Sequence, residues 1–248
     1  MSTVYILWLR QIKRYFRSKS RIIGSLGQPI LFLVALGFGF GPIFARAGKG
    51  DYLQFLTPGI IAMSILFSAI FSGMEIIWDK QFGFLKETLA APVSRFSIMI
   101  GRTLGGATVA FFQGILVFLI SAIIGFRPEN IVKIPLAFLF MLLIALFFSA
   151  LGTAIASILE DMQGFHLIMS FLVMPIFFLS GAVFPLEGLP RVIDFIAKIN
   201  PLSYGVDGVR WALSGVNSFS IFLDFIALGV GVIILLSLGA YLFSKIEI

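Results

Sequence analysis

The chain has 248 residues, of which 59% are hydrophobic and only 12% are charged. Because soluble domains carry about 25% charged residues, this composition excludes an ordinary soluble domain and predicts an integral membrane protein. Cysteine is absent, which excludes disulfides, thiolate metal sites and a cysteine nucleophile. The net charge of +6 arises within residues 1–21, which hold six cations and no acid, so we expect no nucleic-acid partner.

Residues 1–21 predict an amphipathic helix rather than a cleaved signal peptide. A signal peptide has a short charged region followed by an apolar core, whereas here about 20 residues that mix charged and apolar side chains precede the first apolar stretch. Apolar residues spaced four, four and three apart form one helical face: Val4, Trp8, Ile12 and Tyr15. We expect the helix to lie at the membrane interface, with its aromatic residues at headgroup depth. Its cations, which would face anionic lipid, are Arg10, Lys13, Arg14 and Arg17. A soluble tail before the first span is the alternative.

Six apolar stretches follow, each close to the roughly 20 residues that a helix needs to span a bilayer. The sequence therefore predicts an all-α membrane protein whose six transmembrane helices cover residues 22–44, 57–78, 97–125, 134–159, 166–184 and 221–243. The first is the weakest, because glycine and proline interrupt it. With the N-terminus inside, the inside segments hold 11 of the 18 Lys and Arg residues and the outside segments hold 7. This bias predicts that both termini are cytoplasmic.

The long external segment before the last span reads FPLEGLPRVIDFIAKINPLSYGVDGVRWALSG, residues 184–215. Pro190 suits the start of a helix, and Asn200-Pro201 breaks the apolar pattern that follows it. Two short helices result, neither of which is long enough to span. We therefore expect a broken helical hairpin over residues 185–215 that caps the external side; an ordinary folded loop is the alternative.

The motifs of several enzyme classes are missing from the sequence. There is no G-x-x-x-x-G-K-[ST] phosphate loop and no G-x-S-x-G, and His166 is the only histidine, so we expect no catalytic site and no metal site. The predicted spans also appear nearly free of ionisable residues, which argues against a carrier coupled to a proton or ion gradient. Gln28 and Gln113 lie deeper in the spans, where they either join helices by hydrogen bonds or line a path.

The stretch QFGFLKETLAAPVSRFSIMIGR, residues 81–102, covers most of the cytoplasmic loop between the second and third spans and the start of the third span. Its apolar residues fall at helical spacing: Phe82, Leu85, Leu89 and Val93. Pro92 limits this helix, and Ser94 is placed to cap the next one. Because so short an amphipathic helix is marginal in water, it needs a surface for its apolar face. Lipid, the chain's own spans and a groove on a soluble partner are the candidates.

These two segments resemble those of type-2 ABC transporter permeases. FGFLKETLAAPVSRFSIMIGR is similar to the loop ahead of that family's third span, with Gly83 and Pro92 matching its frame. The pattern F-P-L-E-x-L-P…N-P-L-S-Y…R is similar to the region before its last span. The number of spans, the basic N-terminal helix and the length agree too. One departure is Asp79-Lys80-Gln81, where the family favours a Glu-Arg pair.

The resemblance implies a transport subunit, not an enzyme, that pairs with a second permease copy or a sister permease and with two ABC ATP-binding subunits, which hold ATP and Mg. Residues 82–93 would be the coupling helix in a groove of the ATPase, with contacts from Phe82, Gly83, Leu85, Lys86, Glu87, Leu89 and Pro92. The external gate would comprise Phe184, Pro185, Glu187, Pro190, Asn200, Pro201, Tyr204 and Arg210. Family members sit in the cell (inner) membrane and chiefly export drugs, lipids or glycans.

The leading interpretation is an ATP-driven exporter of an amphipathic, lipid-like, glycan or drug substrate. A membrane scaffold or regulator that binds a soluble partner through residues 82–93 and moves nothing is the alternative. An ion-gradient carrier is a third possibility, against which the scarcity of charges in the spans argues.

Overall fold

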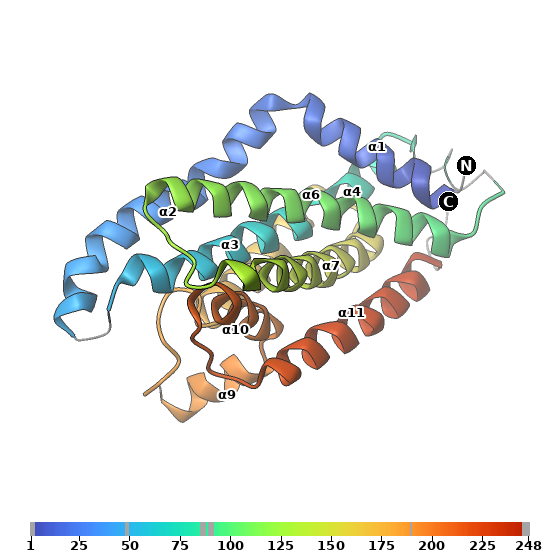
Figure 1. The fold of residues 1–248 in the computed structure, drawn as a ribbon. Helices are drawn as coiled ribbons and strands as arrows, with labels where there is room; N and C mark the ends of the chain where they lie inside the picture. The colour runs from blue at the N-terminus through green and yellow to red at the C-terminus, as the bar shows by residue number, and fades with distance from the viewer. Residues whose placement is uncertain (1–2, 48–49, 85–87, 89–91, 189, 245–248) are drawn as a thin grey trace.

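The computed structural model describes residues 3–47, 50–84, 88, 92–188 and 190–244, and every regular element in these ranges is helical (Figure 1). The elements are α1 (Thr3–Arg17), α2 (Lys19–Arg46), α3 (Tyr52–Phe71), α4 (Met74–Gln81), α6 (Arg95–Ile124), the 3-10 helix η1 (Ile131–Lys133), α7 (Ile134–Ile158), α8 (Met162–Phe178), α9 (Arg191–Ile199), α10 (Pro201–Ser214) and α11 (Ile221–Ser244). The predicted all-α fold is confirmed.

Five helical stretches in the described ranges are long and apolar enough to cross a membrane: Lys19–Arg46, Tyr52–Gln81, Arg95–Ile124, Ile131–Ile158 and Ile221–Ser244. Each overlaps one predicted span. The remaining predicted span, 166–184, falls on α8, which is apolar but has only 17 residues. It begins at Met162 and ends at Phe178, six residues before the predicted end, because the chain turns at Gly181, where the backbone φ is +75°.

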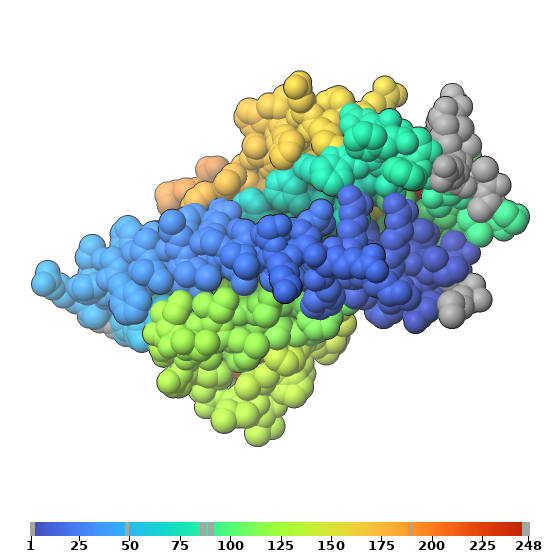
Figure 2. Space-filling view, turned by 90° about the horizontal axis from the view of Figure 1, so that it is seen from above, coloured from blue at the N-terminus to red at the C-terminus, as the bar shows by residue number. Residues whose placement is uncertain are grey.

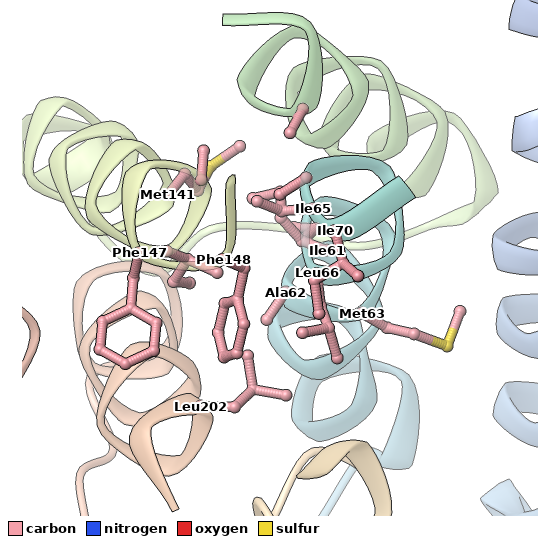
Figure 3. Packing of buried hydrophobic residues seen from close by; sticks show 14 of the residues in the cluster. Ile61, Ala62, Met63, Ile65, Leu66, Ile70, Met141, Phe147, Phe148 and Leu202 are labelled. Carbon is pink, nitrogen blue, oxygen red and sulfur yellow. The ribbon is translucent and has the colours of Figure 1, made fainter. Parts of the chain in front are cut away.

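The centre of the bundle is α3, which packs against α2, α6, α7 and α10. Figure 3 shows Ala62 and Leu66 of α3 next to the ring of Phe148 of α7, with Leu202 of α10 beside them. All four side chains are fully buried. Since lipid tails are as apolar as these side chains, such contacts stabilise the bundle through close packing rather than through removal from water.

A glycine lets α3 lie against the chain that follows α8. A Cβ atom built on Gly59 would lie 2.1 Å from the carbonyl oxygen of Ala182, a distance that no side chain tolerates. Small residues at such crossings are typical of membrane helices. The contact fixes the segment after α8 against α3.

The helices α1 and α2 lie along one face of the molecule (Figure 2). α1 packs along α6, whereas α2 packs mainly along α3, with Phe44 near its end against Tyr52 of α3. Only 17% of the most apolar stretch of α2 is buried, and Leu31, Phe38 and Ile43 are exposed. This face is therefore open to lipid or to another protein chain.

Candidate functional site

Two acidic residues of α4 gather cations from three other helices. Asp79 is 4% exposed and pairs with Arg102 of α6 and, at 3.3 Å, with Arg10 of α1. Glu75, one turn earlier, lies 3.6 Å from Arg14 and 3.2 Å from Arg21. We call these six residues the α4 charge cluster. A buried acid is tolerated at this depth because cations and hydrogen bonds compensate it.

The residue after Asp79 connects α4 to another helix. Lys80 Nζ donates to the carbonyl oxygens of Ser157 at 2.8 Å, Leu159 at 3.0 Å and Ala156 at 3.3 Å. These carbonyls belong to the last turn of α7, where a cation also complements the helix dipole. The last turn of α4 is thus tied to α1, α6 and α7 immediately before residues 82–93.

Helix α1 contacts protein where the sequence predicted lipid. Trp8 Nε1 donates to Thr108 Oγ1 of α6 at 3.0 Å, and Arg10 and Arg14 pair with α4, so these two cations do not face anionic lipid alone. The other two predicted cations, Lys13 and Arg17, are exposed. The periodicity located the helix correctly, but an apolar face of this kind fits protein as well as lipid.

A cavity of about 400 Å³ lies between α1, α2, α3, α4 and α6. Gln113 is 1% exposed at its wall and accepts hydrogen bonds from Tyr15 Oη at 2.8 Å and from Ser25 Oγ at 3.1 Å. Burial raises the pKa of Tyr15, so its hydroxyl remains protonated and able to donate. Gln28 lines the same cavity from α2. The two glutamines therefore share one cavity, and Gln113 also joins three helices.

The loop after α4 is described in part. Gly83 has a φ of +80°, which favours glycine, and its neighbours Phe82 and Phe84 are 73% and 51% exposed. Thr88 has helical backbone and donates to the carbonyl of Phe84 at 3.0 Å. Pro92 is exposed, and the predicted cap Ser94 is confirmed, since it accepts from the backbone N–H of Ser97 at 3.1 Å. The predicted contact residues Leu85, Lys86, Glu87 and Leu89 lie outside the described residues.

The segment before α11 forms the two short helices that the sequence predicted. Pro190 caps α9, and α10 begins at Pro201, after Asn200. Asn200 Oδ1 accepts from the N–H of Leu202 at 3.0 Å, and its Nδ2 donates to Ile176 of α8 at 2.6 Å. Tyr204 Oη donates to the carbonyl of Lys198, which closes the corner between the two helices. Phe184 and Pro185 are half-buried, and Glu187 is exposed.

Arg210 is buried under this segment. Its Nη2 donates to the carbonyls of Gly181 at 2.9 Å and Phe55 at 3.4 Å, and its guanidinium lies 4.1 Å from the centre of the Phe55 ring. Burial lowers the pKa of Arg210 to about 10, which leaves it protonated at neutral pH. Arg210 therefore joins α10 to α3 and to the turn after α8.

Sequence reasoning missed two acids beside Arg210. Asp207 of α10 is 2% exposed, and Asp224, in the first turn of α11, is 0% exposed. Asp224 lies at the edge of a predicted span that seemed free of charge. The signal available in the sequence was the position of Asp224, in the first turn of an apolar stretch and seventeen residues after Asp207. We call Asp207, Arg210 and Asp224 the α10–α11 cluster.

Comparison with known proteins decides the family. The model of the ABC-2 type transporter family matches residues 2–214. The chain belongs to this family. It is 30% identical to a protein of Pyropia yezoensis described as transport permease ycf38, over 96% of this chain and 86% of that protein. It is 27% identical to the inner membrane transport permease YadH of Escherichia coli, over 95% and 90% of the two chains. Nodulation protein J of Rhizobium leguminosarum bv. trifolii is 27% identical over 85% and 78%.

The resemblance inferred from the two loop motifs is thus confirmed, and the chain is a multi-pass membrane protein of a transport permease family. The relatives' printed names describe transport permeases rather than enzymes. Among the described residues, no group of three His, Cys, Asp or Glu side chains could hold a metal ion.

Proposed function

We propose that this chain is the membrane subunit of an ATP-driven exporter and that residues 82–93 form its coupling helix. The observation that carries the proposal is the attachment of α4, which leads directly into this loop and is held by Asp79 and Lys80 to α1, α6 and α7. A force on Phe82, which directly follows α4, would therefore reach three other helices. Family membership and the absence of a phosphate loop in the sequence support a motor on a separate chain.

In this proposal the partner is an ABC ATP-binding subunit, which holds ATP and Mg. The exposed side chains of Phe82 and Phe84 are apolar, as expected for a short helix that enters a groove on a soluble protein. Both chain termini lie on the cytoplasmic side of the cell (inner) membrane, together with the α4 charge cluster. The segment 185–215 then lies outside and gates the far side.

A second permease, either another copy or a sister chain, would complete the path. Exposed apolar residues on α2 and on α8, such as Phe38 and Phe171, leave faces on which a second chain can pack. The cavity beside Gln28 and Gln113 combines apolar and aromatic walls with hydroxyl and amide groups and with the Arg21–Glu75 ion pair, a mixture that suits an amphipathic cargo.

Affinity purification of the tagged chain from native membranes in mild detergent tests the proposal. The variant replaces residues 82–93 with a Gly/Ser loop of equal length. The matched control replaces residues 216–220, the exposed link between α10 and α11, in the same way. Mass spectrometry should find a P-loop ATPase with the wild type and with the control, and lose it with the 82–93 variant.

Substrate-stimulated ATP hydrolysis by the reconstituted complex then separates a pump from a scaffold. A complex that binds the ATPase but never changes its turnover, with any amphiphile screened, supports the scaffold. Retention of the ATPase by the 82–93 variant, at the level of the wild type, contradicts the coupling role of this loop.

A further inference from the structure

Asp224 is the one described carboxylate whose two oxygens are both buried without a hydrogen-bond partner. It is 0% exposed and lies in the first turn of α11, where Phe225 packs on Phe140 of α7 with ring centres 4.6 Å apart. An ionised carboxylate in such surroundings has lost its water and gained nothing in return, which is among the most costly arrangements in a protein. The fold must therefore supply a counterpart.

The counterpart is a second carboxyl. α10 packs on α11, and the Asp207 and Asp224 side chains interact across this contact. Its two oxygens already accept from the backbone N–H groups of Ser218 at 2.7 Å and Phe219 at 3.0 Å. Those two bonds favour the ionised form of Asp207, so Asp207 is the acceptor in the pair and Asp224 is the group free to carry a proton.

Charge balance leads to the same assignment. Arg210 supplies one positive charge to the cluster, and its attraction acts on Asp207. One arginine and two carboxylates would leave a net charge of −1 inside the bundle. With one proton added, the α10–α11 cluster becomes neutral, which is the state that a low-dielectric interior favours.

Among the residues that the structure describes, no other charge is placed to neutralise the pair. The helices α3 and α7, which pack against α10, contain no charged residue, and the charged residues of α6, Arg95 and Arg102, lie in its first two turns. Lys133 of η1 lies over the ring of Trp211, 4.3 Å from its centre. The remaining neighbours, Glu129 near Gly215 and the exposed Asp194–Lys198 pair of α9, belong to the surface.

We propose that Asp207 and Asp224 form a proton-binding site in which one shared proton joins α10 to α11. A metal ion fits this site less well, because hard cations take six or more oxygen ligands and two carboxyls, one of them already occupied by N–H donors, are all that the described cluster offers. Burial also raises the pKa of Asp207, against the opposing effects of Phe219, Ser218 and Arg210, so the pair retains its proton more readily than exposed aspartates do.

The proton has a mechanical consequence. Asp207 holds the link between α10 and α11 through Ser218 and Phe219, and the Phe219 ring packs on Tyr204, 5.1 Å from centre to centre. When the proton leaves, two like charges face each other across the α10–α11 contact and oppose it. The proposed function assigns this segment as the gate on the external side. On that basis, the proton-binding site would make the gate respond to external pH.

Infrared spectroscopy of the full-length chain in nanodiscs tests the proton directly, because a protonated carboxyl and a carboxylate absorb at different frequencies. The wild type should show a protonated-carboxyl band at neutral pH that shifts on ¹³C-aspartate labelling and disappears at alkaline pH. Asp224→Asn should lack this band, whereas the control Asp194→Asn, an exposed acid of the same segment, should retain it. The labelled wild type alone decides the matter if a variant does not fold.

Hydrogen exchange of the link between α10 and α11 tests the mechanical consequence, which we call the latch: the hold of Asp207 on the N–H groups of Ser218 and Phe219. After correction for the intrinsic pH dependence of exchange, the amides of residues 218 and 219 should lose protection as the infrared band disappears. In Asp224→Asn their protection should not change with pH. Absence of a labelled band at neutral pH, or a band unchanged in Asp224→Asn, overturns the shared proton; protection that does not follow the band overturns the latch. Neither measurement needs an ATPase or a substrate, so failure of the proposed function leaves both intact.

Discussion

The two buried charge clusters differ in how their acids are compensated. In the α4 charge cluster, Asp79 has two arginine partners, and so does Glu75. In the α10–α11 cluster, one arginine serves two carboxyls, and Asp224 has no hydrogen-bond partner among the described residues. The first cluster therefore joins four helices by charges that are complete at neutral pH. The second needs a proton, which makes its contact conditional.

The largest expected effect comes from removing the central acid of the first cluster. Asp79→Ala leaves Arg102, whose side chain is 5% exposed, as an uncompensated buried charge. Breaking a buried pair in this way costs about 3–5 kcal/mol of stability. Thermal unfolding in nanodiscs should show a marked fall in midpoint. Asp194→Ala breaks an exposed pair and should cost less than about 1 kcal/mol. Equal falls in the unfolding midpoint of the two variants would contradict the claim that burial makes the Asp79 ion pairs more important for stability.

The second effect concerns the arginine of the other cluster. Arg210→Met removes hydrogen bonds to the carbonyls of Phe55 and Gly181, a loss of about 1.5–3 kcal/mol. It also removes the cation that balances Asp207. In the variant, loss of the shared proton would leave two carboxylates with no positive charge beside them, which destabilises the fold more than in the wild type. The unfolding midpoint should therefore fall more steeply with rising pH than in the wild type. A parallel pH profile would show that Arg210 does not neutralise the pair.

A smaller effect separates the clusters by pH. Because burial raises the pKa of Asp207 in the folded chain, the proton that it shares with Asp224 stabilises the fold fully below the ordinary aspartate pKa, and this stability is lost as pH rises through the folded value. Asp224→Asn should flatten this decline, since an amide can donate to Asp207 at any pH. The expected gain at alkaline pH is a few degrees in the midpoint, about 1 kcal/mol. A midpoint profile identical to that of the wild type would contradict the account.

The smallest effect on stability is expected at Lys80. Lys80→Met preserves the length of the side chain but removes the donor to the last turn of α7. Because Lys80 is only half-buried, water can replace the donor at these carbonyls, and we expect a cost of about 1 kcal/mol, less than at the buried Arg210. We expect the chain to fold and to bind its ATPase, while substrate-stimulated ATP hydrolysis falls several-fold. Lys13→Met, an exposed cation of α1, is the control. If the substrate stimulates ATP hydrolysis of Lys80→Met as strongly as that of the wild type, the α4–α7 contact does not transmit movement between the loop and the bundle.

Local signals in the sequence predicted much of the fold. Apolar stretches located the five long helices, the capping residue Ser94 marked the start of α6, and Asn200-Pro201 marked the break between α9 and α10. These features depend on neighbours within a few residues, which a single sequence displays. The end of α8 was placed too late, because the apolar run continues past Gly181, where the backbone turns.

The clusters were harder to predict because their partners are distant in the chain. Arg10 and Asp79 are 69 residues apart, and no periodicity relates them. The basic N-terminal helix was therefore assigned to lipid, although two of its cations pair with α4. Asp224 was overlooked because an acid in the first turn of a span resembles a residue of the preceding loop. The burial that makes Asp224 a candidate proton site is evident only from the folded structure.

The most direct test of the account is site-specific crosslinking in the cell. The chain contains no cysteine, so single cysteines can be introduced without removing any other residue. Phe84→Cys, in the proposed coupling helix, and Val216→Cys, in the link between α10 and α11, are both at exposed positions. We predict that a crosslinker with a maleimide at one end, for the introduced cysteine, and a photoreactive benzophenone at the other joins position 84, and not position 216, to a P-loop ATPase, with a yield that changes on ATP binding. Crosslinking of position 216 instead, or of neither position, would contradict the proposed coupling.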